Sequence, residues 1–463
     1  MLEEQAPSFP IYVTLSVWGV ILLLVLVRVW HLRDSCATFL LLATWFRYSI
    51  ATFHQYTYPP VVSGLSLIAL TSIGVVAIGL VVVGARSLLA RRLTPFYATM
   101  LVILISAIAN QMWVDAVNAT FKWLYLIVFA VAAYHANLRL GSERVFRSLA
   151  VIFAGPIVLQ WLSVPWGLKT TSVDGSSFFT GGFQHQQAIS IIFLTFLIVT
   201  CFSPSLSLIA SYGRIAIVAV GIALANYRTS LLAAAVPASS LAVSKLAGKI
   251  VPKQRGIAIV LLSLVTVLVL LGVAALARER FADLGAAVDK GALLIKPPEH
   301  FTTEEKRLFS GRVYLWSQYI DAYLDGDIIN ILVGFGPDSW VGRFSTYAHN
   351  TFISYLYEFG LFGLAGLLWI LTSNVLTAAR LRNTEGLIVL SCHIGVIVLN
   401  LSTMGIWTLE GAILYALLLG QTWYLHSIQA VGSGVSQPRI GSGAHACGNR
   451  IHAAALGVRQ HRP

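Results

Sequence analysis

The sequence predicts an all-α fold: a polytopic transmembrane helix bundle of about twelve or thirteen helices, with one large extracytoplasmic loop that contains an amphipathic helix. Hydrophobic residues make up 57% of the 463 residues and charged residues only 11%, whereas a soluble domain carries roughly 25% charged residues. The mean hydropathy is +0.78. Apolar stretches of about 20 residues, long enough to span a bilayer, recur along nearly the whole chain. We therefore expect one membrane-embedded unit.

Each apolar stretch defines a candidate helix. The expected helices cover residues 11–30, 35–53, 61–84, 95–112, 118–135, 148–166, 186–203, 207–225, 229–246, 256–277, 350–376, 384–402 and 409–426.

The basic residues predict the orientation of these helices. Alternate loops are rich in arginine and lysine, and the short loops between them hold only Lys169 and Arg228; these are residues 54–60, 111–117, 168–185, 226–228 and 403–408. Because basic residues collect in cytoplasmic loops, the net charge of +12 indicates membrane topology and does not indicate nucleic acid binding. The acidic N-terminus, which carries Glu3 and Glu4 and does not resemble a signal peptide, is then expected outside and the C-terminus inside.

Four regions follow from this pattern. Residues 1–277 form the N-terminal transmembrane helices, 278–348 the large periplasmic loop, 349–426 the C-terminal transmembrane helices, and 427–463 a disordered cytoplasmic tail rich in Gly, Ser, His and Arg. Within the loop, residues 302–324 show helical spacing of apolar residues among charges, which predicts an amphipathic helix on the membrane surface or over the bundle.

Arg228 is the first candidate functional residue. It follows Asn226 and Tyr227 at the outer end of a helix pair and breaks the charge rule on its side of the membrane. An arginine stays charged at any relevant pH and binds phosphate through two hydrogen bonds, so Arg228 is a candidate anion clamp. The alternative is an interfacial arginine whose side chain reaches the headgroup region.

Further candidates lie in and after the loop. Arg312 and Trp316 follow Gly311, and Arg312 is either a second anion ligand or a solvated surface charge. His349 and Asn350 stand where the chain re-enters the membrane. Histidine titrates near neutral pH and can accept a proton from a hydroxyl group. The alternative is a polar pair that caps a helix.

The segment GGFQHQQ at 181–187 supplies Gln184, His185 and Gln187, which suit binding of sugar hydroxyls or simply a polar helix start. The segment 181–187, Arg228, the pair Arg312 and Trp316, and the pair His349 and Asn350 are all expected on one face of the membrane. Together they predict a site for an anionic, polyhydroxylated ligand. The two acids of Asp325-Gly326-Asp327 in the large loop are interpreted as part of a turn and not as metal ligands, and the cysteines lack a CxxC motif. The site is therefore expected to use no metal ion and no cofactor.

These motifs, in this order, resemble the superfamily of O-antigen ligases and Wzy-type O-antigen and exopolysaccharide polymerases, which are bacterial envelope glycosyltransferases. The resemblance covers roughly residues 180–380. The matching features are Arg228-Thr229 at the start of a helix, the long outer loop, GRVYLW at 311–316, GFGPDS at 334–339, and HNTFISYLYEFGLFG at 349–363.

The resemblance implies transfer of an oligosaccharide from undecaprenyl diphosphate to an acceptor hydroxyl, on the periplasmic face and without metal. It implies that Arg228 and Arg312 hold the diphosphate and that His349 activates or orients the acceptor. Asn350, Gln184, His185, Gln187 and Trp316 would contact substrate. Glu358, Gly334 and Gly336 would have structural roles around that site.

Two activities within this superfamily remain open. A polymerase adds repeat units to a growing lipid-linked chain, and a ligase transfers a finished chain to lipid A-core or to a protein; we favour the polymerase. A polysaccharide or lipid transporter (a flippase) and a non-catalytic assembly subunit are two further hypotheses. The expected location is the bacterial inner membrane. The expected partners are the lipid-linked glycan, its acceptor, the bilayer, a chain-length regulator and a flippase, with no nucleic acid.

Overall fold

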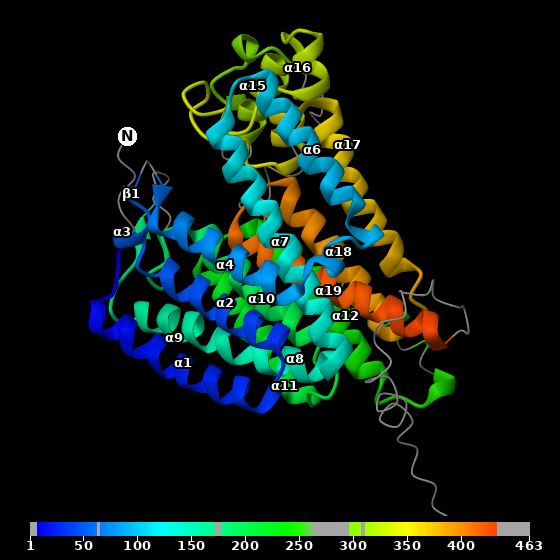
Figure 1. Ribbon diagram of the computed structural model, residues 1–463. Coiled ribbons are helices and arrows are strands. Elements are labelled where there is room, and N and C mark those ends of the chain that lie inside the picture. The colour runs from blue at the N-terminus through cyan, green and yellow to red at the C-terminus, as the bar shows by residue number, and fades with distance from the viewer. Residues whose placement is uncertain are drawn as a thin grey trace, which may run out of the picture.

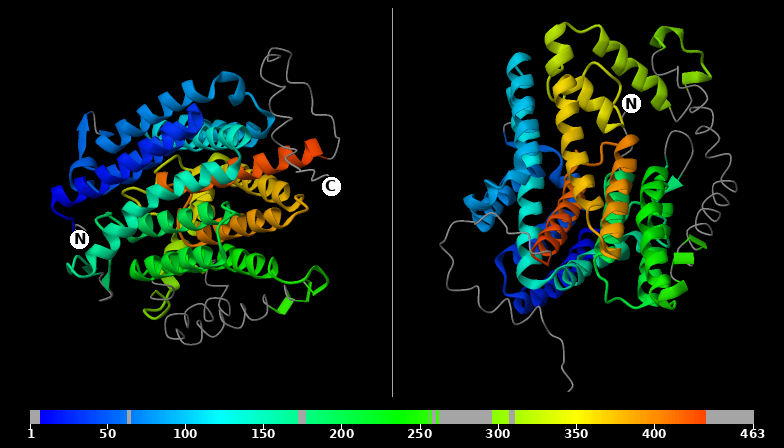
Figure 2. Two further views of the ribbon diagram at one scale, coloured as in Figure 1. Left: turned by 90° about the horizontal axis from the view of Figure 1, so that it is seen from below. Right: turned by 90° about the vertical axis from the view of Figure 1, so that its right-hand side faces the viewer.

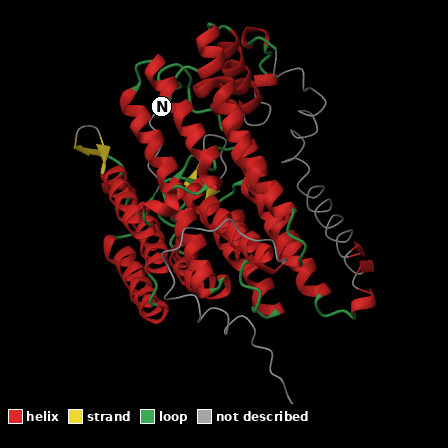
Figure 3. Cartoon of the chain, turned by 45° about the vertical axis from the view of Figure 1, so that its right-hand side comes forward, coloured by secondary structure: helices red, strands yellow, loops and turns green. Residues whose placement is uncertain are grey.

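A computed structural model describes residues 7–62, 65–171, 177–254, 256–257, 260–261, 296–306 and 311–432. Figure 3 shows that this part of the chain is almost entirely helical. Its strands form two short antiparallel ribbons, in which β1 (Pro60–Val62) pairs with β2 (Leu65–Ser66) and β3 (Thr170–Thr171) pairs with β4 (Ser177–Phe178).

The first half of the chain supplies these helices: α1 (Ile11–Leu32), α2 (Ser35–Ala51), α3 (His54–Thr57), α4 (Leu67–Val83), α5 (Ala85–Leu88), η1 (Arg91–Leu93), α6 (Thr94–Ala109), α7 (Trp113–Leu140), α8 (Ser142–Leu149), η2 (Ala150–Phe153), α9 (Ala154–Ser163), α10 (Gln186–Cys201) and α11 (Leu208–Leu224). The second half supplies α12 (Arg228–Ala247), η3 (Pro252–Gln254), η5 (Pro298–His300), α15 (Arg312–Leu324), α16 (Ile328–Val333), α17 (Thr351–Ala379), α18 (Thr384–Leu401) and α19 (Leu409–Gly432).

The structure confirms an all-α polytopic membrane protein. Seven helical stretches of the described chain are long and apolar enough to cross a membrane: Ile11–Leu32, Arg91–Ala109, Trp113–Leu140, Ser142–Ser163, Arg228–Ala247, Thr351–Ala379 and Thr384–Leu401. Three shorter apolar helices, α4, α10 and α11, accompany them. Apart from the expected helix at 256–277, every expected helix corresponds to a described one.

Several boundaries differ from the prediction. The expected helix at 61–84 begins only at Leu67, because the β1–β2 ribbon comes first. The expected helix at 148–166 is part of a longer run from Ser142 that passes through the 3₁₀ segment η2. Pro156 explains that segment, since proline has no N–H to donate to the carbonyl of Ile152.

The third difference concerns the amphipathic helix expected at 302–324. Helix α15 begins at Arg312, because Gly311 has a φ of 80° and a helix cannot continue through that conformation. Helix α19 likewise runs to Gly432, past the boundary expected at 426. The expected helix at 256–277, the first part of the large loop and the tail from 433 onward lie largely or wholly outside the described residues.

Helices α7, α10 and α19 form the interior of the bundle (Figure 1). Small residues allow α7 and α19 to pack closely, since a Cβ added at Gly420 would lie 2.5 Å from the Cβ of Ala133. Outer helices expose large apolar side chains, for example Leu23 on α1, Val81 on α4 and Ile209 on α11. Such apolar outer faces fit a lipid environment.

Contacts group the loops at two ends of the bundle. At the basic end, Arg139 pairs with Asp34 at 2.6 Å and Lys245 donates to the carbonyl of Pro204 at 2.6 Å. At the other end, which we call the loop end, Asn350 donates to the carbonyl of Leu401 at 2.8 Å. This grouping follows the predicted alternation of basic and non-basic loops.

At the loop end, α15 and α16 lie together beyond the main bundle and over the ends of α6, α7 and α17 (Figure 1). The right-hand view of Figure 2 shows α15 lying across the end of α17. A small second core holds them in place, formed by Leu315, Tyr319, Tyr323, Ala348 and Tyr357. This core fixes the position of the candidate site at the loop end.

A buried ion pair joins α2 to α19. The Nη2 atom of Arg47 lies 2.7 Å from Oε1 of Glu410, and both side chains are buried. Removing one partner of such a pair leaves an uncompensated charge and typically costs about 3–5 kcal/mol. We expect Glu410→Leu to lower the thermal unfolding temperature in detergent strongly, and the double variant Arg47→Met/Glu410→Leu to recover most of the loss. A double variant as unstable as the single one would contradict this account.

Candidate functional site

The loop between α18 and α19 joins three segments that are far apart in the sequence. Arg312 Nη1 donates to the carbonyl of Ser402 at 2.8 Å, and the hydroxyls of Thr229 and Ser402 lie 3.0 Å apart. Asn350 donates to the neighbouring carbonyl of Leu401. The starts of α12, α15 and α17 therefore meet at one loop.

Arg312 is held at the first turn of α15. On the same helix, Val313, Leu315 and Tyr319 are buried. One turn after Arg312, Trp316 donates its indole N–H to the carbonyl of Ala348 at 2.7 Å. This bond connects α15 to the residue that immediately precedes His349. Helix α15, which carries Arg312 and Trp316, is therefore fixed next to His349.

His349 stands just before α17 in an unusual backbone conformation. Its φ is 50°, which is uncommon for a residue with a side chain and is typical of functional or tightly constrained positions. Asn350 caps the helix, since its side-chain oxygen accepts from Phe352 N at 2.9 Å and Ile353 N at 3.1 Å. Asn350 thus has the capping role that was the alternative to substrate binding, and His349 lies outside the helix.

The environment of His349 keeps its imidazole neutral. Burial, followed by the positive charge of Arg312, lowers its pKa from 6.5 to about 4. Within the described part of the chain, His349 Nδ1 is buried without a hydrogen-bond partner. A neutral imidazole has one nitrogen that can accept a proton, so His349 is chemically suited to act as a base.

A cavity of about 640 Å³ contains both residues. It is lined by Gly311, Arg312, Tyr314, Leu315, Gln318, Arg343, Phe344, Ser345, Thr346 and His349. The cavity thus combines two guanidinium groups, one neutral histidine and several hydroxyl and amide groups. It can accommodate an anionic group beside an acceptor for a proton.

Arg343 was not among the residues predicted from the sequence. Its guanidinium carbon lies 5.1 Å from the ring centre of Phe335 and 5.7 Å from that of Tyr357, so aromatic rings orient it. Nothing in the sequence separates it from the other loop arginines except its position six residues before His349. The structure makes it a third cationic candidate.

Arg228 is not among the residues that line the cavity. It opens α12, as predicted, and its side chain is exposed. The preceding residue is closer to the site: burial raises the pKa of Tyr227, and the Arg312 guanidinium and the Thr403 hydroxyl oppose that rise. The segment 226–229 therefore contacts the site through Tyr227 and Thr229.

The segment at 181–187 reaches the site through one residue. Gln187 is buried, and its Oε1 accepts from the hydroxyl of Tyr347 at 2.9 Å. The Tyr347 ring in turn lies 4.0 Å from the His349 ring, centre to centre. Gln184 is half-buried and His185 is exposed just before α10, and the structure gives no contact that brings either to the cavity.

The GFG turn at 334–336 rests on a kink in α17. Phe335 N donates to the carbonyl of Tyr357 at 3.0 Å and Gly336 N to that of Glu358 at 2.9 Å. The Glu358 carboxylate accepts from Asp338 N at 2.8 Å and from the hydroxyl of Ser354. The carbonyls of α17 are free for this turn because Gly360, with a φ of 65°, interrupts the helix.

Gly334 and Gly342 allow a test of this contact, because both have a φ of 77°. A Cβ at Gly334 would lie 2.3 Å from the Glu358 carbonyl carbon, whereas a Cβ at Gly342 would meet nothing within 4 Å. We expect Gly342→Ala to cost about 1–3 kcal/mol through backbone strain alone. Gly334→Ala should lower the thermal unfolding temperature much further, and equal effects of the two changes would contradict the proposed role of the turn.

A model of the protein family described as O-antigen ligase matches residues 199–368. This range includes the start of α12, the whole of α15 and the segment from Gly334 to Gly360. No curated protein matches the chain.

Proposed function

We propose that this chain, whose residues 199–368 match the family described as O-antigen ligase, is a membrane glycan-transfer enzyme. It transfers an oligosaccharide from undecaprenyl diphosphate to an acceptor hydroxyl, without a metal ion. The form of this reaction that we propose is the polymerisation of O-antigen or exopolysaccharide repeat units. The alternative is a ligase that transfers the glycan to lipid A-core or to a protein.

One observation carries this proposal: Arg312 and a neutral His349 line the same cavity. In the reaction, the bond between the anomeric carbon and the diphosphate oxygen breaks, and a bond from that carbon to the acceptor oxygen forms. The acceptor proton passes to His349, and undecaprenyl diphosphate leaves with the bonding electron pair. Both halves of this chemistry have a group in the cavity that serves them.

The arginines support the departure of the diphosphate. Arg312 is fixed by the Ser402 carbonyl through Nη1, lies beside Tyr227 and lines the cavity. Fixed cations stabilise developing negative charge without reorganising during the reaction. We propose that Arg312 is the main diphosphate ligand, that Arg228 assists at the entrance from the start of α12, and that Arg343 contributes from the cavity wall.

The remaining predicted residues have positioning or sugar-binding roles in this proposal. Gln187 and Tyr347 support His349 from one side, and Trp316 and Asn350 anchor its flanking segments. Gln184 and His185 lie at the start of α10, where they would meet a longer glycan. Glu358, Gly334 and Gly336 hold the turn beneath α16.

We also propose that the loop end faces the periplasm of a bacterial inner membrane. The argument is the charge distribution, since the loops with Arg33, Arg139 and Lys245 gather at the opposite end and basic loops stay in the cytoplasm. In this arrangement residues 1–277 and 349–426 are the two transmembrane parts, 278–348 is the periplasmic loop and 427–463 the cytoplasmic tail.

The test is a transfer assay on the purified full chain with a lipid-diphosphate-linked repeat unit, with and without a lipid A-core acceptor. A ladder of products from the donor alone would establish a polymerase. A single product that requires the second acceptor would establish a ligase. No product from a verified natural donor, together with donor movement across vesicle membranes, would replace the proposal with a flippase.

A further inference from the structure

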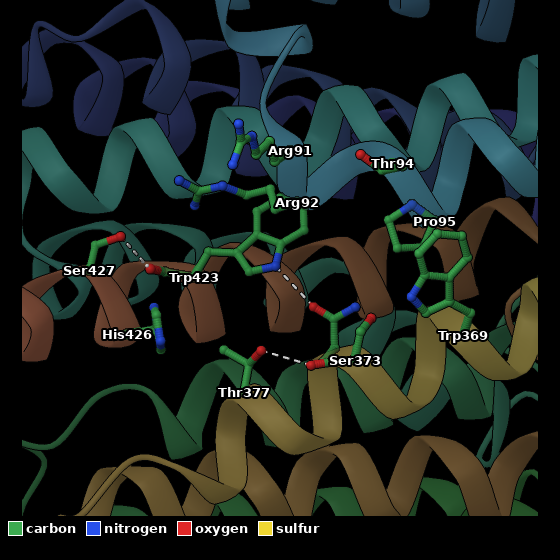
Figure 4. Close-up of a pocket in the computed structure, with 11 residues that line it drawn as sticks. Arg91, Arg92, Thr94, Pro95, Trp369, Ser373, Thr377, Trp423, His426 and Ser427 are labelled. Carbon is green, nitrogen blue, oxygen red and sulfur yellow. Dashed lines mark hydrogen bonds between the residues drawn. The ribbon is translucent and has the colours of Figure 1, made fainter. Parts of the chain in front are cut away.

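A second pocket lies at the basic end of the bundle, between η1 with the start of α6, the second half of α17 and the last turns of α19 (Figure 4). Its volume is about 700 Å³. It is lined by Arg91, Arg92, Thr94, Pro95, Trp369, Ser373, Asn374, Thr377, Trp423, His426 and Ser427. None of these lining residues takes part in the reaction proposed above.

The pocket is separate from the candidate active site. Asn350 caps the start of α17 at the loop end, and Ser373 and Thr377 lie on the last turns of the same helix. Because a helix rises 1.5 Å per residue, the two sites are roughly 35 Å apart along α17. The polar groups of the two sites therefore do not contact each other.

Positive charge collects in this pocket. Arg91 and Arg92 lie next to each other at its edge, and both are exposed (Figure 4). The positive charges of Arg92 and Arg380 also both act on the ring of His426. No carboxylate is present among the described residues that line the pocket. A pair of arginines without an acidic partner in the lining is a suitable site for a phosphate group.

The pocket is preorganised for such a group. The Arg92 guanidinium carbon lies 4.1 Å from the Tyr134 ring centre and 5.5 Å from that of Trp423, so aromatic faces hold it in place. Beneath it, Trp423 donates its indole N–H to Asn374 Oδ1 at 2.9 Å. The buried floor is therefore fixed, while the charged edge is accessible.

The polarity of the pocket changes along its length. Arg91, Arg92 and His426 lie toward the helix ends, and Ser373 and Thr377 follow on α17. Farther along α17, toward the middle of the bundle, Trp369 exposes 48% of its surface opposite Pro95. This order, from charged through polar to apolar, matches the order of groups in a phospholipid from headgroup to acyl chain.

We propose that this pocket binds an anionic phospholipid from the leaflet at the basic end of the bundle. Arg91 and Arg92 take the headgroup phosphate, Ser373 and Thr377 lie beside the glycerol region, and the acyl chain passes along Trp369 and Pro95. Basic pockets between transmembrane helices on the cytoplasmic side bind anionic lipid headgroups in this way. The inference does not depend on the reaction proposed above.

The test uses the full chain purified in an uncharged detergent and follows its thermal unfolding temperature during lipid titration. Phosphatidylglycerol should raise this temperature by several degrees, because a ligand that binds the folded state stabilises it by mass action. Phosphatidylcholine and inorganic phosphate should have little effect. An equal rise with phosphatidylcholine would show non-specific lipid binding, and a rise with inorganic phosphate alone would show a free anion as the occupant; either result overturns the proposal.

Amino-acid substitutions test whether phosphatidylglycerol acts through this pocket. Arg91→Gln removes one phosphate ligand, and Ser373→Leu fills part of the pocket without changing charge. Both should abolish most of the rise with phosphatidylglycerol. Arg86→Gln is the matched control, since Arg86 is also an exposed arginine at the basic end but does not line the pocket. A rise in Arg91→Gln and Ser373→Leu as large as that in Arg86→Gln would refute the site.

Discussion

Replacing Arg312 by alanine should lower the rate of glycan transfer by about 10²–10³-fold, the loss typical when one fixed donor to a developing negative charge is removed. The guanidinium lines the cavity together with His349 and is oriented by the carbonyl of Ser402 at 2.8 Å. Arg312→Lys keeps the positive charge, but an ammonium cannot bind Ser402 and a phosphate with the same planar geometry. We therefore expect the transfer rate of Arg312→Lys to fall by roughly tenfold or more, which is less than the fall in Arg312→Ala.

Two controls separate this effect from a general change of charge or fold. Lys306→Ala removes a positive charge from the same loop, next to Tyr314 but outside the cavity lining, and should leave the rate nearly unchanged. The thermal unfolding temperature of Arg312→Ala should stay within a few degrees of the wild type, because α15 is held by its apolar residues. An Arg312→Ala protein with more than half of the normal rate would remove Arg312 from the proposed reaction.

Most of the membrane helices could be predicted from the sequence because their signal is local. A run of about 20 apolar residues must form a helix in a bilayer whatever its neighbours are. Boundaries were missed where the backbone overrode the hydrophobic pattern, as Gly311 does at the start of α15 and the β1–β2 ribbon does before α4. Both act through the backbone, and hydrophobic periodicity does not register either effect.

The candidate site was predictable only in part, since its geometry depends on distant contacts. Arg312 and His349 were selected for their chemistry, and the structure brings them into one cavity. Arg228 was selected on the same grounds, but its side chain is exposed and does not line the cavity, and the segment contacts Arg312 and Ser402 through Tyr227 and Thr229. The role of Ser402 as the common partner could not be seen, because a carbonyl carries no sequence signal.

The partners of charged side chains also could not be predicted from the sequence. The partner of Arg47 is Glu410, which is 363 residues away along the chain. Arg343 became a candidate only when the cavity was defined. In each case the residue type indicated a need for a partner, and only the packing of α2, α17 and α19 determined which partner it was.

Replacing His349 by alanine should lower the rate by about 10²–10⁴-fold, the usual contribution of a general base. His349→Gln fills similar space and can still accept a hydrogen bond, but it cannot take a proton, so its loss should be nearly as large. Gln187→Leu removes the partner of Tyr347, which stacks near His349. If His349 is the base, Gln187→Leu should cost much less than either change at His349 itself.

The pH dependence of kcat/KM provides a stricter test, since it reports the ionisation of the free enzyme. A base must be neutral to work, and the pKa of His349 is lowered from 6.5 to about 4 by burial and then by Arg312. The loss of activity on protonation should therefore appear as the pH falls toward about 4, and kcat/KM should be flat around pH 6.5. In Arg312→Gln the repulsion from the guanidinium is gone, so the pKa of His349 should be higher than in the wild type. As the pH is lowered, kcat/KM of this variant should therefore begin to fall at a higher pH. An acid limb centred near 6.5 in the wild type, or one that does not move in Arg312→Gln, would show that His349 is not the buried neutral base inferred from the cavity.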